Sequence, residues 1–234
     1  TVSIAPGGTH ADAAETLYIG PGTYQIDGTW EIYAKNIVID PNAIIQGTGS
    51  IQIYNPSVAG GAASITNVDG NNQSSSIGVA VVLNNASGMQ ITELPFPADL
   101  TAAGFSNNTA DNTLYLGTDL NLAVDGADVT LDATVKGDLR FDSDATISNY
   151  SANRMVITNN STVSHMVKDA FSSGSFFFPV GIADGDYTPT SLTGGGPYHV
   201  SVTDYAASVA SVLTPEEGMD RTWHIYGATA TSMT

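Results

Sequence analysis

The fold is decided by residues 37–53, which read IVIDPNAIIQGTGSIQI. Three short apolar runs in this stretch, at 37–39, 43–45 and 51–53, are separated by turn-forming Asp, Pro, Asn and Gly. Successive side chains of a strand point to opposite faces, so in Ile51-Gln52-Ile53 the two isoleucines share one face and the glutamine takes the other. The stretch therefore predicts short strands joined by tight turns at steps of about seven residues.

The same unit recurs on both sides of this stretch. Further strand centres are expected at 17–19, 24–26 and 30–32, and apolar–polar–apolar triplets return at 114–116, 120–122, 129–131 and 139–141. Three such strands per coil of about twenty residues is the rhythm of a stacked β-solenoid. The sequence thus predicts an all-β protein with a right-handed β-solenoid (β-helix) over residues 1–165. A protruding loop is expected near 55–78, where Pro56 and a polar run interrupt the rhythm.

The character of the chain changes after about residue 165. Segments such as Tyr198–Val202 and Arg221–Tyr226 alternate over longer runs, and Gly/Pro-rich connections such as Gly194–Pro197 separate them. This pattern favours a small β-sandwich-like module over residues 166–234. Because the chain begins at Thr1 and ends in an uncharged strand-like segment, we expect a mature form or a part of a longer polypeptide, with the C-terminal module truncated or continuing.

Composition narrows the classes of partner. Six Lys and Arg stand against 23 Asp and Glu, for a formal net charge of −17. This charge repels nucleic-acid phosphates and anionic membranes, so we expect no nucleic-acid partner and no membrane insertion. The absence of cysteine excludes disulfides and thiolate metal sites. An acidic chain whose solubility rests on Thr, Ser, Asn and Gly suits a protein outside the cell, where salt screens its self-repulsion.

The second half of the chain holds a series of short motifs in a fixed order: Asn149–Asn159, His165–Lys168, Phe178–Gly181, Tyr187–Pro189 and Arg221–Trp223. This order resembles a module of large cell-surface proteins of Bacteroidota-type bacteria exported by the type IX secretion route. The resemblance implies a surface-attached or released β-rich protein of adhesive or structural role, and it carries no catalytic residue.

Two acidic features are candidates for cation binding. Asp184 and Asp186 flank Gly185 in a turn and could offer carboxylates to Ca²⁺. The alternative is that they only accept hydrogen bonds from the backbone of the turn, as Asp commonly does. Calcium is therefore a candidate cofactor without being required. A second acidic run surrounds Lys136 and Arg140 and consists of Asp125, Asp128, Asp132, Asp138, Asp142 and Asp144. These carboxylates are either stacked on one another, so that they need cations, or solvated in turns with ordinary surface ion pairs.

Aromatic and basic residues supply the remaining candidates. Trp30, Tyr24 and Tyr33 form either a stacking platform for a sugar or part of the core. Arg154 and Arg221 lie in the motifs that carry the resemblance, and we expect them to pair with acids at the junction of the two predicted domains. The four histidines show no close metal-ligand spacing, and no Ser/His/Asp set is evident.

These observations favour a non-enzymatic, extracellular structural or adhesive surface protein, and a filament subunit is one form of it. Its partners would be copies of itself or other surface proteins. An alternative is a carbohydrate-binding module of a larger adhesin, with glycans as partners. A β-helix polysaccharide lyase with Arg140 as its base is a third hypothesis, which the acidic surface disfavours for an anionic polymer.

Overall fold

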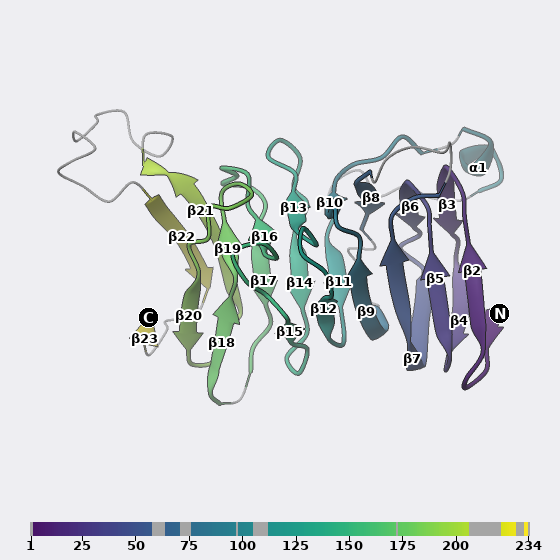
Figure 1. The fold of residues 1–234 in the computed structure, drawn as a ribbon, viewed down its shortest axis with the longest axis horizontal. Helices are drawn as coiled ribbons and strands as arrows, with labels where there is room; N and C mark the ends of the chain where they lie inside the picture. The colour runs from purple at the N-terminus through teal and green to yellow at the C-terminus, as the bar shows by residue number, and fades with distance from the viewer. Residues whose placement is uncertain are drawn as a thin grey trace.

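The structure is a computed structural model that describes residues 2–57, 64–70, 76–96, 98–104, 112–171, 173–205, 221–227 and 232–233. The described chain is almost entirely β, which confirms the predicted all-β class. Its strands stand side by side along the long axis, and the two termini lie at opposite ends (Figure 1). In the part of the chain that is described, no helix has the length and apolar character needed to span a bilayer.

The first sheet is parallel and runs through most of the molecule. Its N-terminal end is widened because β2 (Thr9–Asp12) pairs with β5 (Thr29–Ile32), which in turn pairs with β7 (Ala43–Tyr54). The sequence predicted two strands within β7, and the structure joins them across a register shift between Gln46 and Ser50. In spatial order the main path is β1 (Val2–Ile4), β4 (Gly22–Ile26), β7, β9 (Gly78–Asn84), β12 (Leu120–Leu122) and β15 (Ile147–Ser148).

The second sheet is also parallel and has seven strands among the described residues. It includes β8 (Thr66–Asp69), which lies within the interval 55–78 predicted as a loop and pairs with two neighbouring strands. The rest of that interval lies partly outside the described residues, at 58–63 and 71–75. The full order is β3 (Thr16–Ile19), β6 (Asn36–Ile39), β8, β10 (Met89–Ile91), β13 (Val129–Leu131), β16 (Val156–Ile157) and β19 (Val180–Gly181).

Pairing changes from parallel to antiparallel near the C-terminal end. In the third sheet β11 (Leu114–Leu116), β14 (Leu139–Phe141) and β17 (Met166–Lys168) are parallel. Strands β21 (Tyr198–Asp204) and β22 (Arg221–Gly227) then continue this sheet in antiparallel fashion. A fourth, antiparallel sheet holds β18 (Ser175–Phe178), β20 (Thr190–Thr193) and β23 (Ser232–Met233). The one helix among the described residues is α1 (Ala98–Ala102).

The two-domain division at 165/166 stays a prediction. Parallel pairing extends past that position, because β17 pairs with β14 and β19 pairs with β16. Antiparallel pairing begins within the same stretch of chain, at β18 and β21. The two types of pairing therefore overlap in sequence between residues 166 and 204.

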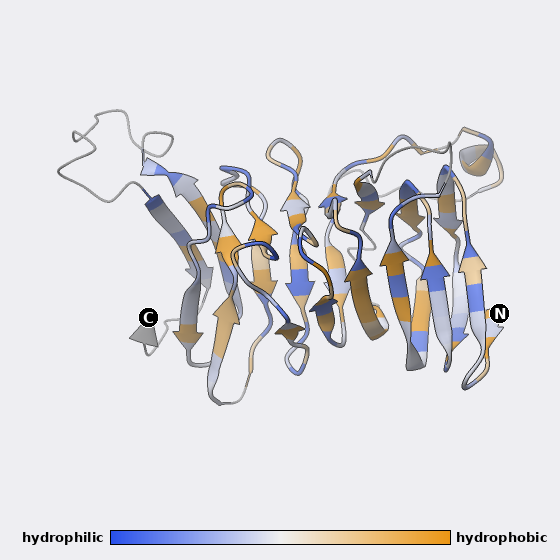
Figure 2. Cartoon of the chain, viewed as in Figure 1, coloured by the Kyte–Doolittle hydropathy of each residue, from blue (hydrophilic) through white to orange (hydrophobic). Residues whose placement is uncertain are grey.

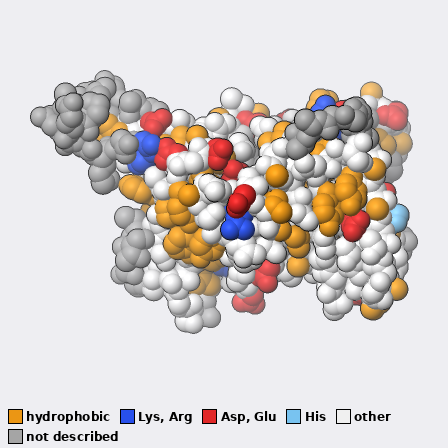
Figure 3. All heavy atoms as spheres, viewed as in Figure 1, with side chains coloured by type: hydrophobic (Ala, Val, Ile, Leu, Met, Phe, Trp, Pro, Cys, Tyr) orange, Lys and Arg blue, Asp and Glu red, His pale blue; other side chains and the backbone are white. Residues whose placement is uncertain are grey.

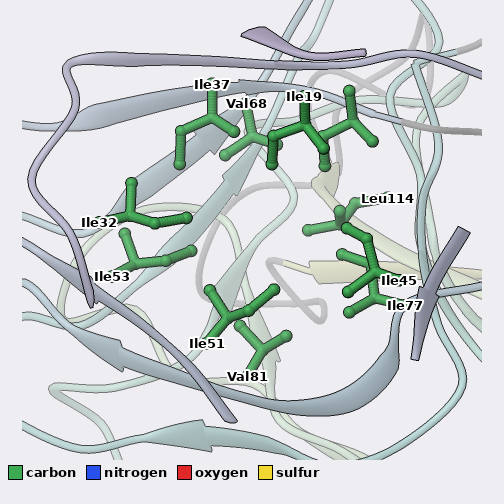
Figure 4. Close-up of a pocket in the computed structure, with 11 residues that line it drawn as sticks. Ile19, Ile32, Ile37, Ile45, Ile51, Ile53, Val68, Ile77, Val81 and Leu114 are labelled. Carbon is green, nitrogen blue, oxygen red and sulfur yellow. The ribbon is translucent and has the colours of Figure 1, made fainter. Parts of the chain in front are cut away.

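The core lies between the sheets and follows the predicted alternation. Leu139 and Phe141 are fully buried while Arg140 between them is exposed, and β10, β11, β12 and β13 likewise bury their two end residues on either side of a half-buried one. Figure 2 shows this as alternating hydrophilic and hydrophobic bands along the strands. A residual cavity of about 20 Å³ near the N-terminal end is lined entirely by apolar side chains (Figure 4). A cavity of this size has room for about one water molecule, but its apolar lining offers no hydrogen-bond partner, so it belongs to the core.

Aspartates link segments that are neighbours in the sheets. Three backbone N–H groups donate to carboxylates that lie 27 residues earlier in the chain: Thr146 to Asp119 at 3.1 Å, Met155 to Asp128 at 2.8 Å and His165 to Asp138 at 2.7 Å. Asp27 accepts in the same way from the Thr48 N–H. Hydrogen bonds to a charged acceptor are stronger than neutral ones. Two members of the acidic run, Asp128 and Asp138, therefore help to hold neighbouring segments together.

A column of glycines lies at the neighbouring strands β2, β5 and β7. Gly8, Gly28 and Gly49 stack there, and the N–H groups of Thr29 and Ser50 donate to the Gly8 and Gly28 carbonyls, both at 2.9 Å. A Cβ on Gly28 would lie 2.2 Å from the Gly8 carbonyl oxygen, and one on Gly49 would lie 1.9 Å from the Gly28 oxygen. The backbones approach so closely at this column that no side chain fits between them.

Candidate functional site

The three candidate aromatic residues do not form one platform. Trp30 is only 4% exposed, and its indole N–H donates to an Asp12 carboxylate oxygen at 2.7 Å. Tyr24 stacks on Trp30 with ring centres 5.9 Å apart. Tyr33 instead stacks on Tyr54 at 4.8 Å. Trp30 therefore works as a core residue, and the candidate aromatic residues belong to two separate stacked pairs, Tyr24–Trp30 and Tyr33–Tyr54.

The two carboxylates proposed for calcium have different surroundings. Asp184 is exposed, whereas Asp186 is half-buried and forms an ion pair with Arg221. The same guanidinium reaches Asp204 at 3.1 Å, so one arginine joins the turn at 184–186 to β21. A guanidinium on the Asp186 carboxylate opposes a second cation at the same oxygens.

Two further basic residues, Arg154 and Arg140, also face acids. Arg154 is half-buried, with its Nε 3.4 Å from an exposed Asp125 carboxylate oxygen. Arg140 donates from Nε and Nη2 to the same Asp169 oxygen, at 2.9 and 2.8 Å, and lies over the Tyr115 ring. Arg140 thus has a fixed carboxylate partner, whereas a lyase base has to be deprotonated and near its substrate.

A cluster that the sequence did not reveal lies on the outer face of the third sheet. Asp138 and His165 each immediately precede a strand, β14 and β17, and those strands pair with Leu139 opposite Met166. The two side chains are therefore neighbours on one face. His199 comes from the antiparallel strand β21, where it lies opposite Val167, so it shares that face and sits diagonal to His165.

The geometry of this histidine cluster (Asp138, His165 and His199) is compact. One potential metal-ligating atom from each residue lies within 4.8 Å of the others. His165 Nδ1 is 3.6 Å from Asp138 Oδ1, and the two imidazole centres are 5.9 Å apart and edge-on. Asp138 and His165 are buried, whereas His199 is half-buried. The cluster thus has a closed side formed by the sheet and an open side at His199.

His199 and Lys136 set the protonation and the charge around the cluster. Burial lowers the pKa of His199 below its ordinary value despite the nearby Asp138, which keeps this imidazole neutral at pH 7. Lys136 Nζ lies 3.6 Å from Asp138 Oδ2, on the other oxygen from the one that faces His165. The cluster therefore presents imidazole nitrogens and one carboxylate oxygen on the same side.

Comparison with known proteins identified no relative of this chain. Neither a family model, nor a curated protein, nor a solved structure matches this chain. The function is therefore argued from the chain itself.

A second buried polar group lies inside the stack. Asp69, at the end of β8, is 2% exposed, and its Oδ2 has no hydrogen-bond partner among the described residues. Burial raises its pKa to about 7, and the negative charge of Glu93 adds to the effect. The folded protein therefore holds Asp69 in its protonated form under mildly acidic conditions.

This raised pKa predicts a loss of stability towards alkaline pH. The folded pKa lies above the unfolded one, so the contribution of Asp69 is complete below pH 4 and is lost as pH rises through about 7. One such proton changes the free energy of unfolding by up to about 1.4 kcal/mol per pH unit. Urea unfolding from pH 4 to 8 should show this slope in the wild type and a flatter one in Asp69→Asn. Asp144→Asn, which removes an exposed carboxylate, should keep the wild-type slope; equal slopes in all three would contradict the prediction.

Proposed function

We propose that the chain is a β-solenoid joined to a β-sandwich-like module, and that it serves outside the cell as a non-enzymatic structural or adhesive protein. Assembly with further copies of itself is part of this proposal. The resemblance to cell-surface proteins of the type IX secretion route supports the location. The repeated pairing of strands one coil apart supports the solenoid, because each coil buries its apolar residues against its neighbours.

The observation that carries the assembly is the edge at β1, β2 and β3. Each of these strands pairs with a neighbour on one side, through β4, β5 and β6, and among the described residues none pairs on the other side. An open edge presents backbone N–H and C=O groups to an incoming strand. An open hollow of about 430 Å³ at this edge is lined by residues 2–5 and 8–10.

The surface is compatible with packing against a like chain. On the face shown in Figure 3, basic and acidic atoms occur in small groups, and uncharged polar and backbone atoms cover much of the rest. Val2, on β1, is an exposed apolar residue at the edge, with 43% of its surface accessible. Burying it beneath a neighbouring strand would favour association by about 1 kcal/mol.

The edge should control self-association. We expect sedimentation-velocity experiments at rising concentration, in high salt with calcium, to show wild-type chains associating. Val2→Lys should weaken this association about ten-fold, because a lysine at an edge strand resists pairing. The matched control is Val163→Lys, which makes the same change at a residue that is also 43% exposed and lies outside the strands.

Two outcomes would contradict the proposal. A wild-type protein that stays monomeric at all concentrations would contradict the proposed self-association into a filament. Equal weakening by Val2→Lys and Val163→Lys would show that the added charge acts without regard to the edge. Electron microscopy of associated samples should reveal end-to-end particles, since the edge lies at one end of the long axis (Figure 1).

A further inference from the structure

The third sheet carries a group of side chains that the proposed structural role does not use. Histidine is a costly choice for a buried position, because its ring nitrogens both need partners. His165 is 8% exposed, and its Nε2 is fully buried without a hydrogen-bond partner among the described residues. The same imidazole belongs to a cluster with a second imidazole and a carboxylate, and its Nδ1 lies 3.6 Å from Asp138 Oδ1.

We infer that Asp138, His165 and His199 form a binding site for a divalent transition-metal ion of the zinc type. Two imidazoles and one carboxylate match the borderline character of Zn²⁺, Co²⁺ and Ni²⁺, whereas Ca²⁺ takes oxygen ligands. Metal-bound donors at about 2.1 Å in tetrahedral geometry lie about 3.4 Å from one another. The 4.8 Å limit on the present separations means that each donor closes in by less than about 1 Å.

The fold supports these ligands in the way that metal sites require. The Asp138 carboxylate is fixed by the His165 backbone N–H, which donates to its Oδ1 at 2.7 Å. The edge of the His165 ring is packed against Tyr226, with centres 5.4 Å apart. Such contacts orient ligands and strengthen a site. The half-buried His199 forms the open side, so water or an exogenous ligand completes the coordination.

Lys136 would compete with a metal ion for the Asp138 carboxylate. Its Nζ lies 3.6 Å from the Asp138 Oδ2, on a side chain that is 45% exposed. An ammonium at the carboxylate reduces the attraction for a cation, but the exposed stem lets it move away. Replacement of Lys136 by Gln is therefore expected to tighten metal binding, an effect that a merely structural cluster would not show.

The test is metal binding by the whole chain. Isothermal titration with Zn²⁺ should give one ion per chain for the wild type, and Co²⁺ should give the visible absorption of a tetrahedral site. His199→Gln should weaken Zn²⁺ binding by at least about ten-fold. His224→Gln should bind as the wild type does, because His224 lies on the next strand outside the cluster and bonds to Thr203 at 2.9 Å. Circular dichroism of each variant verifies that the fold is kept.

The inference stands apart from the proposed assembly, and the outcomes separate the two. Loss of zinc in His199→Gln with sedimentation unchanged supports the metal site alone. No zinc uptake by the wild type, or equal affinities for wild type and His199→Gln, would overturn it. A His224→Gln variant that loses zinc as strongly as His199→Gln would also overturn the assignment, because the ligands would then be others.

Discussion

Gly49→Ala should destabilise the protein by about 3 kcal/mol, near the upper end of the usual cost of overpacking. Its Cβ would lie 1.9 Å from the Gly28 carbonyl oxygen and 2.8 Å from the carbonyl carbon of Asp27. Both atoms belong to backbone, so no flexible side chain can move aside. The strands β5 and β7 would have to separate at this point, and the hydrogen bond from the Ser50 N–H to the Gly28 carbonyl would lengthen.

Urea unfolding followed by circular dichroism measures this loss. Gly195→Ala is the matched control, because its added Cβ meets no atom within 4 Å. It should change the free energy of unfolding by no more than about 0.5 kcal/mol. If Gly49→Ala were as stable as this control, the strands at the glycine column would be further apart than the structure has them.

Lys168→Met should cost a similar amount for a different reason. The side chain is buried, and its ammonium donates to the carbonyls of Asp142, Ser143 and Ala145 while lying over the Phe176 ring. All three ammonium hydrogens therefore have partners. Methionine keeps the apolar stem but leaves three carbonyls of the turn without a donor. The expected loss is about 3 kcal/mol, and more if water cannot reach the turn.

The contrast with a surface lysine makes this prediction specific. Lys35 is 48% exposed and pairs with Glu15 at 3.1 Å. Lys35→Met should change the free energy of unfolding by less than about 1 kcal/mol, because exposed ion pairs contribute little. Equal losses in the two variants would mean that the loss of a positive charge from this acidic chain, and not the buried carbonyl cage, sets the cost.

Local alternation made most of the strands predictable. Two examples are Leu139-Arg140-Phe141 and Leu114-Tyr115-Leu116. Each forms a strand whose first and third residues are buried, as the apolar–polar–apolar order requires. Alternation acts over three residues, so it needs no knowledge of the rest of the chain. The segment Gly47-Thr48-Gly49 was harder, because it has the composition of a turn. In the structure it lies inside β7, and Gly47, at a φ of 136°, belongs to the irregularity between the two halves.

The histidine cluster could not be predicted because its ligands are far apart in sequence. Asp138 and His165 meet because the parallel strands that follow them, β14 and β17, pair with Leu139 opposite Met166, and His199 joins them through an antiparallel strand. One signal was present: Asp138 and His165 both immediately precede short strand segments, at Leu139 and Met166. Aligning those segments as neighbouring parallel strands would have placed the two side chains next to each other.

The stack keeps its register while the length of its connections varies. Val2 lies opposite Tyr24, and Val81 opposite Leu120, so the chain between paired positions nearly doubles without altering the parallel pairing. Closing a loop of twice the length costs only about 0.6 kcal/mol. Evolution can therefore enlarge a single connection of this protein, and an engineer can insert a foreign peptide there, while the neighbouring parallel strands keep their pairing.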